Sequence, residues 1–406
     1  MNKSIKLKDF YIICLILSLV LNIINTNLVP IGSYITLIRL LLFSFAFLAF
    51  VLSRSQVKKT DIALFIVLSV LQFFGYLYSR STNYLNSSYL SGITFIISYF
   101  LFVRFPTNIN MNANQKDIYL TKLMKIIFFV AVISSIYAML FQLGGNIFSF
   151  RNSSNFNISN VYCSFWGHRN QFATILLGGF LAAIYLHQDF MNKKIYYIFT
   201  FIFLANIVLT LSRTVFVAVF AFFLCYLICQ WKTRKKYVII ISLLALTIVL
   251  MYLYIPSIRS FTDKYMIRSD SGLTGREYLW ELALSLIDLP TVLFGRGSGI
   301  DRIVLTNDNV SAGVGFHNMY LTYIISVGII VLIIMVVSTI KLIIKLRRNY
   351  AKNNILLFSW TVGCIASMMS YGMFEASLFF GLYPAPMLMT LFVFTIPAIL
   401  TSSQSK

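Results

Sequence analysis

Long apolar runs separated by short polar stretches make up most of this 406-residue chain. A transmembrane helix needs about 20 mostly apolar residues to cross the hydrocarbon core of a bilayer. The pattern predicts about twelve such helices, at residues 9–28, 31–52, 61–78, 89–103, 118–143, 170–187, 194–211, 214–231, 237–256, 318–340, 355–374 and 381–401. We therefore expect an all-α fold, that of a polytopic membrane protein.

One long polar segment interrupts the apolar pattern late in the chain, at residues 257–316. Most of the acidic residues of the chain fall in or next to this segment, together with several arginines. The chain therefore divides into predicted helices one to nine (1–256), one large external loop (257–316) and helices ten to twelve (317–406).

The loop itself contains the pattern of a short helix. Thr274 and Glu277 have the spacing of an N-terminal capping box, and apolar residues recur with helical spacing between positions 279 and 287. We expect an amphipathic helix that lies on the outer membrane face or on the helix bundle and that ends at Pro290.

Composition and charge agree with a membrane protein. Hydrophobic residues make up 59% of the chain and charged residues only 11%, whereas soluble domains are about 25% charged. The net charge of +21 would indicate nucleic acid binding in a soluble protein. Here the lysines and arginines gather in alternate loops, which is the positive-inside pattern. The pattern predicts cytoplasmic N- and C-termini, an external 257–316 loop, and no nucleic acid partner.

Metal and cofactor motifs are missing from the sequence. The chain has no HExxH, no paired CxxC and no DxD, and its five cysteines lie mostly in apolar runs. Such cysteines are usually small buried apolar side chains. We expect no metal site and no cofactor.

Several cationic residues are predicted at the outer boundary of the membrane, and they are Arg169, Arg213, Arg276, Arg296, the deeper Arg39, and His317. Arginine binds phosphate oxygens through two parallel hydrogen bonds, so the group suits a lipid-linked pyrophosphate. Arg39 needs a counter-charge or a polar cavity at its depth, and Glu375, near the outer end of a predicted helix, could pair with it.

Each of these residues also has an ordinary structural explanation. Arg213 could reach lipid headgroups, Arg276 could be solvated, and a histidine at a helix start is more often structural. The run Gly295–Gly299 around Arg296 could wrap a phosphate with backbone amides or form a flexible turn. The shared position of several cations at one boundary favours a common anionic substrate.

Four short motifs occur in order within residues 160–335, and they are GHRNQFA (167–173), LSRT (211–214), GREYLW followed by LFGRG (275–280 and 293–297), and HNMYL (317–321). This order, with one large external loop late among about twelve helices, resembles the O-antigen ligase/polymerase superfamily. Those multi-pass enzymes polymerise or transfer bacterial surface polysaccharides.

The resemblance implies a GT-C-like membrane glycosyltransferase in the cytoplasmic (inner) membrane, whose donor is a polyprenyl-pyrophosphate-linked oligosaccharide. It implies catalytic roles for His317, Arg213 and Arg276, and substrate-binding roles for Arg169, Arg296, Asn170 and Asn318. Arg39 is predicted to bind substrate from its position among the boundary cations. A histidine suits the removal of a proton from the acceptor hydroxyl. Asp263 or Asp301 is the alternative base.

Three functions are open at this point. The favoured one is a repeat-unit polymerase for O-antigen, capsule or exopolysaccharide, which transfers the glycan onto a lipid-linked repeat. The alternatives are an O-antigen ligase, which transfers polymer to lipid A core or protein, and a lipid-linked oligosaccharide flippase. A capped helix in a late external loop favours an enzyme over a flippase. We also expect membrane lipid, a chain-length regulator and a flippase as partners.

Overall fold

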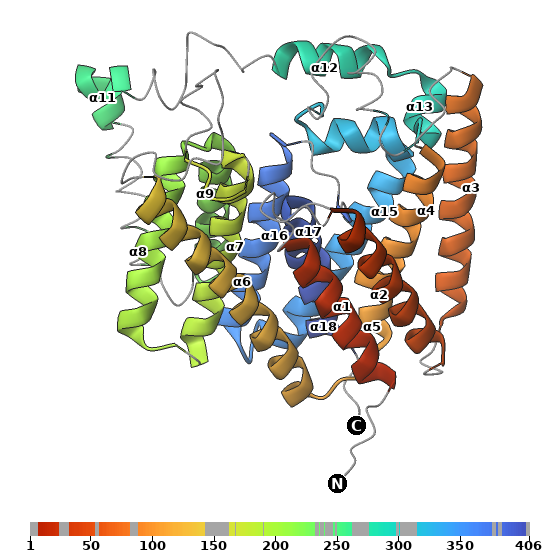
Figure 1. The fold of residues 1–406 in the computed structure, drawn as a ribbon, viewed down its shortest axis with the longest axis horizontal. Coiled ribbons are helices and arrows are strands. Elements are labelled where there is room, and N and C mark those ends of the chain that lie inside the picture. The colour runs from red at the N-terminus through yellow and green to blue at the C-terminus, as the bar shows by residue number, and fades with distance from the viewer. Residues whose placement is uncertain are drawn as a thin grey trace.

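All regular elements of the described residues in this computed structural model are helices (Figure 1). The structure describes residues 7–23, 32–52, 57–81, 88–142, 162–231 except 167 and 190, 250–261, 276–297, 315–375, 379–380 and 384–402, with positions 235, 239, 247 and 300 between them. The helices are α1 (Leu7–Ile23), α2 (Gly32–Leu52), α3 (Lys59–Ser81), α4 (Ser88–Tyr99), the π-helix η1 (Phe100–Arg104), α5 (Phe105–Asn108), α6 (Ala113–Phe141), α7 (Arg169–Asp189), α8 (Lys193–Thr210), α9 (Arg213–Cys229), α11 (Pro256–Phe261), α12 (Arg276–Ser285), α13 (Leu289–Phe294), α15 (Met319–Tyr350), α16 (Ile355–Gly372), α17 (Pro384–Thr390), the π-helix η5 (Leu391–Thr395) and α18 (Ile396–Thr401).

The helices follow the predicted apolar runs. Each run except 237–256 coincides with a helix or with a continuous series such as α17–η5–α18, and run 237–256 lies mostly outside the described residues. Within the described residues, seven helices are long and apolar enough to cross a membrane, and three more apolar helices are shorter. These lengths and compositions indicate an integral membrane protein, while the number of twelve spans stays a prediction.

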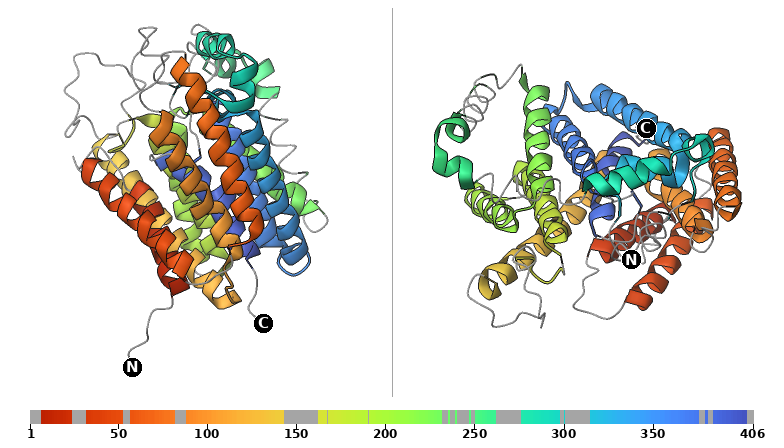
Figure 2. Two further views of the ribbon diagram at one scale, coloured as in Figure 1. Left: turned by 90° about the vertical axis from the view of Figure 1, so that its right-hand side faces the viewer. Right: turned by 90° about the horizontal axis from the view of Figure 1, so that it is seen from above.

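The last span of the chain forms the centre of the bundle. The continuous helix Pro384–Thr401 is buried along its whole length. It packs against α1, α7, α15 and α16, which come from all parts of the chain (Figures 1 and 2). A helix that is apolar on every side can be surrounded by other helices or by lipid, and in this structure other helices surround it.

A proline explains the local widening of the helix at η1. Pro106 has no N–H to donate to the carbonyl of Phe102, four residues earlier, and that carbonyl instead accepts a hydrogen bond from Thr395 at 3.1 Å. The carbonyl of Leu101, in the same wide turn, accepts one from the Tyr11 hydroxyl at 2.6 Å. Two contacts across the bundle therefore replace backbone hydrogen bonds that the π-helix and the proline leave open.

Two short helices, α12 and α13, lie across one end of the bundle, hereafter the α12 end (Figures 1 and 2). Leu279 and Ala283 of α12 are buried together with Phe316 and with Ile325 of α15. The apolar stripe predicted in the loop therefore faces the bundle. Thr274, the predicted capping residue, lies outside the described residues.

The expectation that Pro290 ends this helix was wrong. α12 ends at Ser285, and Pro290 lies in the first turn of α13. Proline suits a helix start because its missing N–H has no partner there and its φ is already helical. Asp288 caps the new helix by accepting a hydrogen bond from the Thr291 N–H at 2.9 Å.

The predicted single span 318–340 is also different in the structure. Gly328 has φ 82° and ψ 160°, so the helix axis changes direction there and the chain continues helical to Tyr350. A Cβ at Gly328 would lie 2.4 Å from the backbone oxygen of Leu293, at the end of α13. Only glycine accepts both this conformation and this close approach, and an apolar pattern alone does not reveal such a kink.

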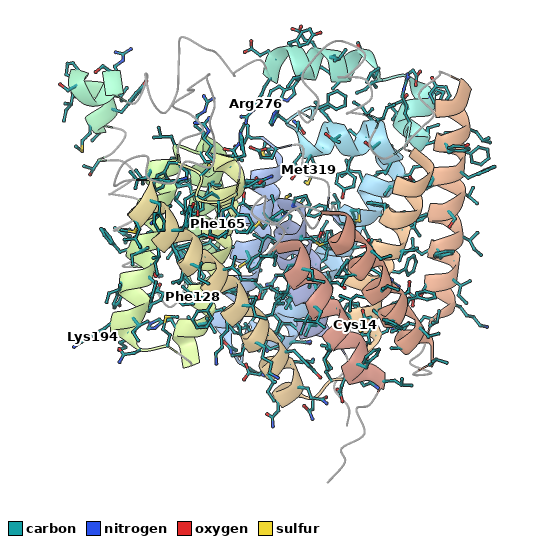
Figure 3. The ribbon with its side chains drawn as sticks, in the orientation of Figure 1. Cys14, Phe128, Phe165, Lys194, Arg276 and Met319 are labelled. Carbon is teal, nitrogen blue, oxygen red and sulfur yellow. The ribbon has the colours of Figure 1, made fainter. Side chains whose placement is uncertain are left out.

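The two ends of the bundle carry different residues. Arg276 lies at the α12 end and Lys194 at the opposite end (Figure 3). The start of α1 and the end of α18 also lie at the Lys194 end (Figure 1). This arrangement agrees with the positive-inside pattern. The assignment of the α12 end to the outside, and the division at residues 256 and 316, stay predictions.

Candidate functional site

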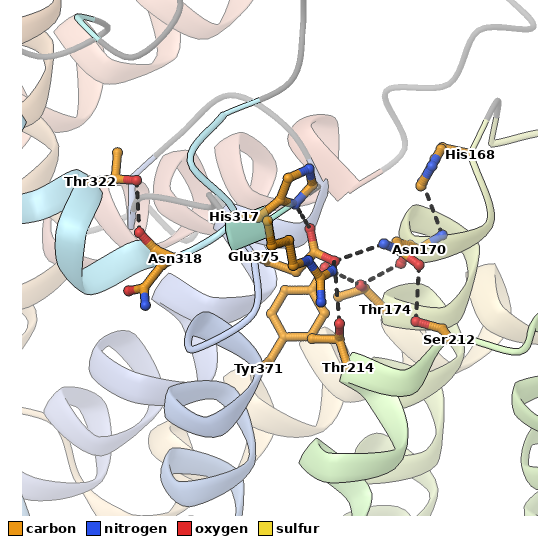
Figure 4. A network of polar contacts seen from close by, with 11 residues as sticks. His168, Asn170, Thr174, Ser212, Thr214, His317, Asn318, Thr322, Tyr371 and Glu375 are labelled. Carbon is orange, nitrogen blue, oxygen red and sulfur yellow. Dashed lines mark hydrogen bonds and ion pairs between the residues drawn. The ribbon is translucent and has the colours of Figure 1, made fainter. Parts of the chain in front are cut away.

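A buried carboxylate, Glu375, lies just after α16 at the α12 end and is only 8% exposed. Its Oε1 accepts hydrogen bonds from Asn170 Nδ2 at 2.7 Å and from Thr214 Oγ1 at 3.4 Å. Arg276 Nη2 lies 3.8 Å from Oε1, and His317 Nδ1 lies 3.6 Å from Oε2 (Figure 4). We call these five residues the Glu375 cluster. Four separate parts of the chain meet on one side chain.

A second layer of hydrogen bonds fixes Asn170. Ser212 Oγ donates to Asn170 Oδ1 at 3.1 Å, so the amide nitrogen faces Glu375. Thr174 donates to the Asn170 carbonyl at 2.7 Å and lies 2.9 Å from the Tyr371 hydroxyl (Figure 4). Because both ends of its amide are engaged, Asn170 holds the carboxylate in a defined place.

A two-residue turn, Leu211 and Ser212, places the LSRT motif at this end of the bundle. Leu211, the C-cap of α8, has φ 51°, in the left-handed region, and its N–H donates to the carbonyl of Val208. Ser212 follows and α9 begins at Arg213. This left-handed residue reverses the chain between two spans, so the hydroxyls of Ser212 and Thr214 both reach the Glu375 network.

His317 is positioned by an unusual backbone. Its φ is 49°, a conformation that costs a non-glycine residue about 1 kcal/mol or more. Asn318 follows as the N-cap of α15, where its Oδ1 accepts from the N–H groups of Tyr320 and Leu321 at 3.0 and 3.2 Å. His317 Nδ1 is buried and, within the described structure, has no hydrogen-bond partner. Its backbone conformation is typical of functional sites.

Arg276 lies in the first turn of α12, where a cation opposes the helix dipole. An anionic partner compensates for this position, and in the structure that partner is Glu375. The two side chains are 12% and 11% exposed, so their charges interact with little screening by water.

The other predicted residues divide into three groups. Arg213 and Arg169 are the first residues of α9 and α7, half-buried and adjacent in sequence to cluster members. The Asn318 side-chain oxygen caps α15. Arg39 lies on α2, but its side chain is outside the described part, as are Asp263 and Asp301.

Arg296 belongs to a second polar cluster. Its Nε donates to Thr291 Oγ1 at 2.9 Å, and its Nη2 donates to the Leu286 carbonyl and to Asp288 Oδ2, both at 3.2 Å. The guanidinium also lies over the Tyr78 ring, 5.3 Å from its centroid, and the Tyr78 hydroxyl donates to Asp288. We call this the Arg296 cluster. Arg296 is 8% exposed, and these contacts favour a structural role for it.

The same contacts change the acidity of Asp288. Burial alone would raise its pKa, but hydrogen bonds from Thr291 and Tyr78 and the charge of Arg296 favour the carboxylate and lower the pKa to about 2. This carboxylate therefore stays ionised at neutral pH.

The Glu375 cluster combines a proton acceptor with a group that binds anions. A histidine with a free ring nitrogen can take a proton, and an arginine can neutralise phosphate. Among the described residues, no three His, Cys, Asp or Glu side chains come together as metal ligands. The geometry suits transfer of a group that leaves as an anion.

The fold and the cluster define a helical membrane protein with a polar site at one end of its bundle. Residues 198–336 match the sequence profile of a family described as O-antigen ligase. This part of the chain, from within α8 to beyond the kink of α15, is therefore similar to the O-antigen ligase/polymerase superfamily, whose members are glycosyltransferase-like enzymes acting on lipid-linked oligosaccharides. Neither the curated proteins nor the solved structures gave a match.

The matched region includes Arg213, Arg276 and His317 but neither Asn170 nor Glu375. Glu375 is the residue that sequence reasoning did not place in the site. The available signal was its position as an acid near the outer end of an apolar run, and the partner expected for it was Arg39.

Proposed function

We propose that the protein polymerises oligosaccharide repeats at the outer face of the cytoplasmic membrane. It transfers the glycan from polyprenyl pyrophosphate onto a lipid-linked repeat, without a metal ion. The observation that carries this proposal is the convergence of Arg276 and His317 on one buried carboxylate at the α12 end, at 3.8 and 3.6 Å. The family match supplies the substrate class.

In this proposal the arginines stabilise the leaving group. Pyrophosphate leaves readily once its developing charge is neutralised, and preorganised arginines can do this without a metal. Arg276 and Arg213 are the best placed, since one is in the cluster and the other lies between Ser212 and Thr214. Arg169, at the start of α7, is adjacent in sequence to Asn170.

His317 is the proposed general base. Its Nε2 takes the proton of the acceptor hydroxyl while the acceptor oxygen bonds to the anomeric carbon of the donor glycan. The bond between that carbon and the pyrophosphate oxygen breaks, and polyprenyl pyrophosphate leaves with the bonding electron pair. The histidine then returns its proton to water.

A ligase is the second candidate, because the matching family is described as O-antigen ligase. The chemistry at the donor is the same in both cases. The difference lies in the acceptor, which for a ligase is lipid A core or a protein rather than another lipid-linked repeat.

Reconstitution of the purified protein in vesicles tests both candidates. The vesicles contain polyprenyl-pyrophosphate-linked repeats, no other acceptor, and a metal chelator. A ladder of longer lipid-linked chains supports the polymerase. Product that forms only after lipid A core or protein is added supports the ligase, and no glycan transfer with any of these acceptors would contradict both.

A further inference from the structure

We propose that Glu375 is the positioning residue of His317, holding it in the tautomer that carries its proton on Nδ1 and leaves Nε2 free. The inference rests on the proposed function and deepens it, because it specifies how the base is prepared. It also assigns a role to two residues, Asn170 and Glu375, that lie outside the matched region of the family.

The first argument is that the two carboxylate oxygens of Glu375 contact different groups. Its Oε1 accepts hydrogen bonds from Asn170 and Thr214 at 2.7 and 3.4 Å, which fix the group in place. Its Oε2 faces His317 Nδ1 at 3.6 Å (Figure 4). The carboxylate is anchored through one oxygen and presents the other to the histidine.

The second argument is the state of the histidine nitrogen. His317 Nδ1 is buried and makes no hydrogen bond within the described residues, and an unsatisfied buried polar atom costs about 1–3 kcal/mol. A shift of about 0.5 Å would bring it within hydrogen-bond distance of Glu375. Catalytic hydrogen bonds commonly shorten in this way when substrate binds.

The tautomer follows from this contact. A neutral imidazole has one donor and one acceptor nitrogen, and an ionised carboxylate only accepts. Nδ1 must then carry the proton, and the lone pair of Nε2 is available for the acceptor hydroxyl. The same carboxylate stabilises the imidazolium after proton transfer, as in other carboxylate–histidine pairs.

The fixed orientation of Asn170 makes this idea testable. Ser212 donates to Asn170 Oδ1, so Asn170 can only donate to position 375. In Glu375→Gln, the new amide would turn its oxygen to Asn170 and Thr214 and its NH₂ group to His317. Nδ1 would then accept, the proton would move to Nε2, and the base would be lost. In a serine protease triad, the corresponding carboxylate-to-amide change costs about 10⁴-fold in rate.

A second substitution should reverse this change. In Asn170→Asp/Glu375→Gln, the new carboxylate at position 170 accepts from Ser212 and from the NH₂ group of the glutamine. The glutamine oxygen then faces His317 and accepts from Nδ1, as Glu375 does. The formal charge of the double variant equals that of the natural protein, so a recovery would come from orientation and not from charge.

The experiment uses the small number of histidines in the chain, which are His168, His187 and His317. The full-length His168→Gln/His187→Gln protein, labelled with ¹⁵N-histidine in lipid nanodiscs, reports the tautomer of His317 alone by NMR. All further variants are made in this background. The same samples are assayed for glycan transfer from polyprenyl-pyrophosphate-linked repeats, with kcat and KM determined separately.

We expect the Nδ1–H tautomer of His317 in the background protein. In Glu375→Gln we expect the Nε2–H tautomer and a kcat lower by about 10²–10⁴-fold. In the double variant we expect the Nδ1–H tautomer to return and kcat to recover at least tenfold. KM for the donor should change only a few-fold. An Nε2–H tautomer in the background protein overturns the inference whether or not the variants fold. A Glu375→Gln protein with unchanged tautomer and kcat overturns it as well. If the background protein transfers no glycan while Glu375 still controls the tautomer, the proposed function fails and the positioning role stands.

Discussion

The Glu375 and Arg296 clusters lie at the same end of the bundle and each combine an acid, an arginine and a threonine, but their contacts differ. Arg296 donates to Thr291 and Asp288 at 2.9 and 3.2 Å, within hydrogen-bond distance. The ion pairs of Glu375 with Arg276 and His317 are longer, at 3.8 and 3.6 Å. In the Arg296 cluster the arginine is hydrogen-bonded to protein groups, whereas in the Glu375 cluster the contacts of Arg276 and His317 are longer than hydrogen bonds.

Under the proposed function, this difference favours Arg276 over Arg296 as the arginine that binds the donor phosphate. A guanidinium whose N–H groups are engaged by the protein would have to break those bonds to bind phosphate. Arg276 is held by a long ion pair and can exchange its partner at lower cost. A satisfied buried network stabilises a fold, whereas long contacts and a strained backbone at His317 are typical of a site that changes during function.

The largest expected effect tests the Glu375 cluster directly. Arg276→Ala or His317→Ala should lower glycan transfer by about 10²-fold or more, because each removes transition-state stabilisation or the base. Protein level and membrane insertion should be unchanged. The matched control is His187→Ala, whose ring stacks on Tyr196 near the junction of α7 and α8. Full-length polymer from both cluster variants would contradict the site.

The next largest effect concerns the kink of α15 at Gly328. Gly328→Ala should lower the free energy of unfolding by about 2–3 kcal/mol, since alanine is strained at φ 82° and its Cβ would meet Leu293 O. Thermal unfolding in detergent measures this. The matched control is Gly92→Ala in α4, where the nearest atom is the end of the flexible Gln72 side chain at 3.1 Å. Equal stability of the two variants would show that the kink is not required.

A matched pair of substitutions separates the two clusters. Arg296→Met should lower the melting temperature, at a cost of about 1–2 kcal/mol, because Asp288 and Thr291 lose their partner. Its kcat, measured on folded protein, should fall less than tenfold. Arg276→Met should have the opposite profile, with large loss of kcat and little change in melting temperature. If both variants changed kcat and melting temperature to the same extent, the distinction between the two clusters would be wrong.

The smallest effect is a pH dependence of stability. The pKa of Asp288 is lowered from 3.8 to about 2 in the folded state, so its contribution is complete above about pH 5 and is lost as pH falls toward 2. The side chain is 42% exposed, so we expect less than about 1 kcal/mol. The melting temperatures of the natural protein and Asp288→Asn should therefore converge between pH 5 and pH 2.5. A difference that does not depend on pH would argue against the ionised pair.

Much of the fold could be predicted because spanning a bilayer is a local property of sequence. A run of about 20 apolar residues is sufficient to indicate a helix, and each predicted run within the described residues is one. The kink at Gly328 could not be predicted, because glycine within an apolar run does not change its hydropathy. Pro290 was misassigned because proline is compatible both with the end of one helix and with the start of the next.

The site was predicted less completely. The motifs indicated Arg276 and His317, which the structure brings to the same carboxylate. They did not identify that carboxylate, because contact between α7, α9, α12 and α16 depends on how distant segments pack. Arg296 illustrates the same limit, since its sequence neighbours suggested a phosphate loop and its spatial neighbours are protein groups that already satisfy it.

The contact between Asn170 and Glu375 has a consequence for engineering and for the comparison of homologues. The proposed catalytic side chains, Arg213, Arg276 and His317, lie inside the family segment 198–336, but the residues that orient them come from before and after it. Under the proposed mechanism, residues 198–336 therefore do not contain all the side chains that the site needs. Under this mechanism, a chimera that exchanged only this segment between two relatives would combine a base from one protein with an orienting carboxylate from the other, so we expect a functional exchange to need α7 and the end of α16 as well.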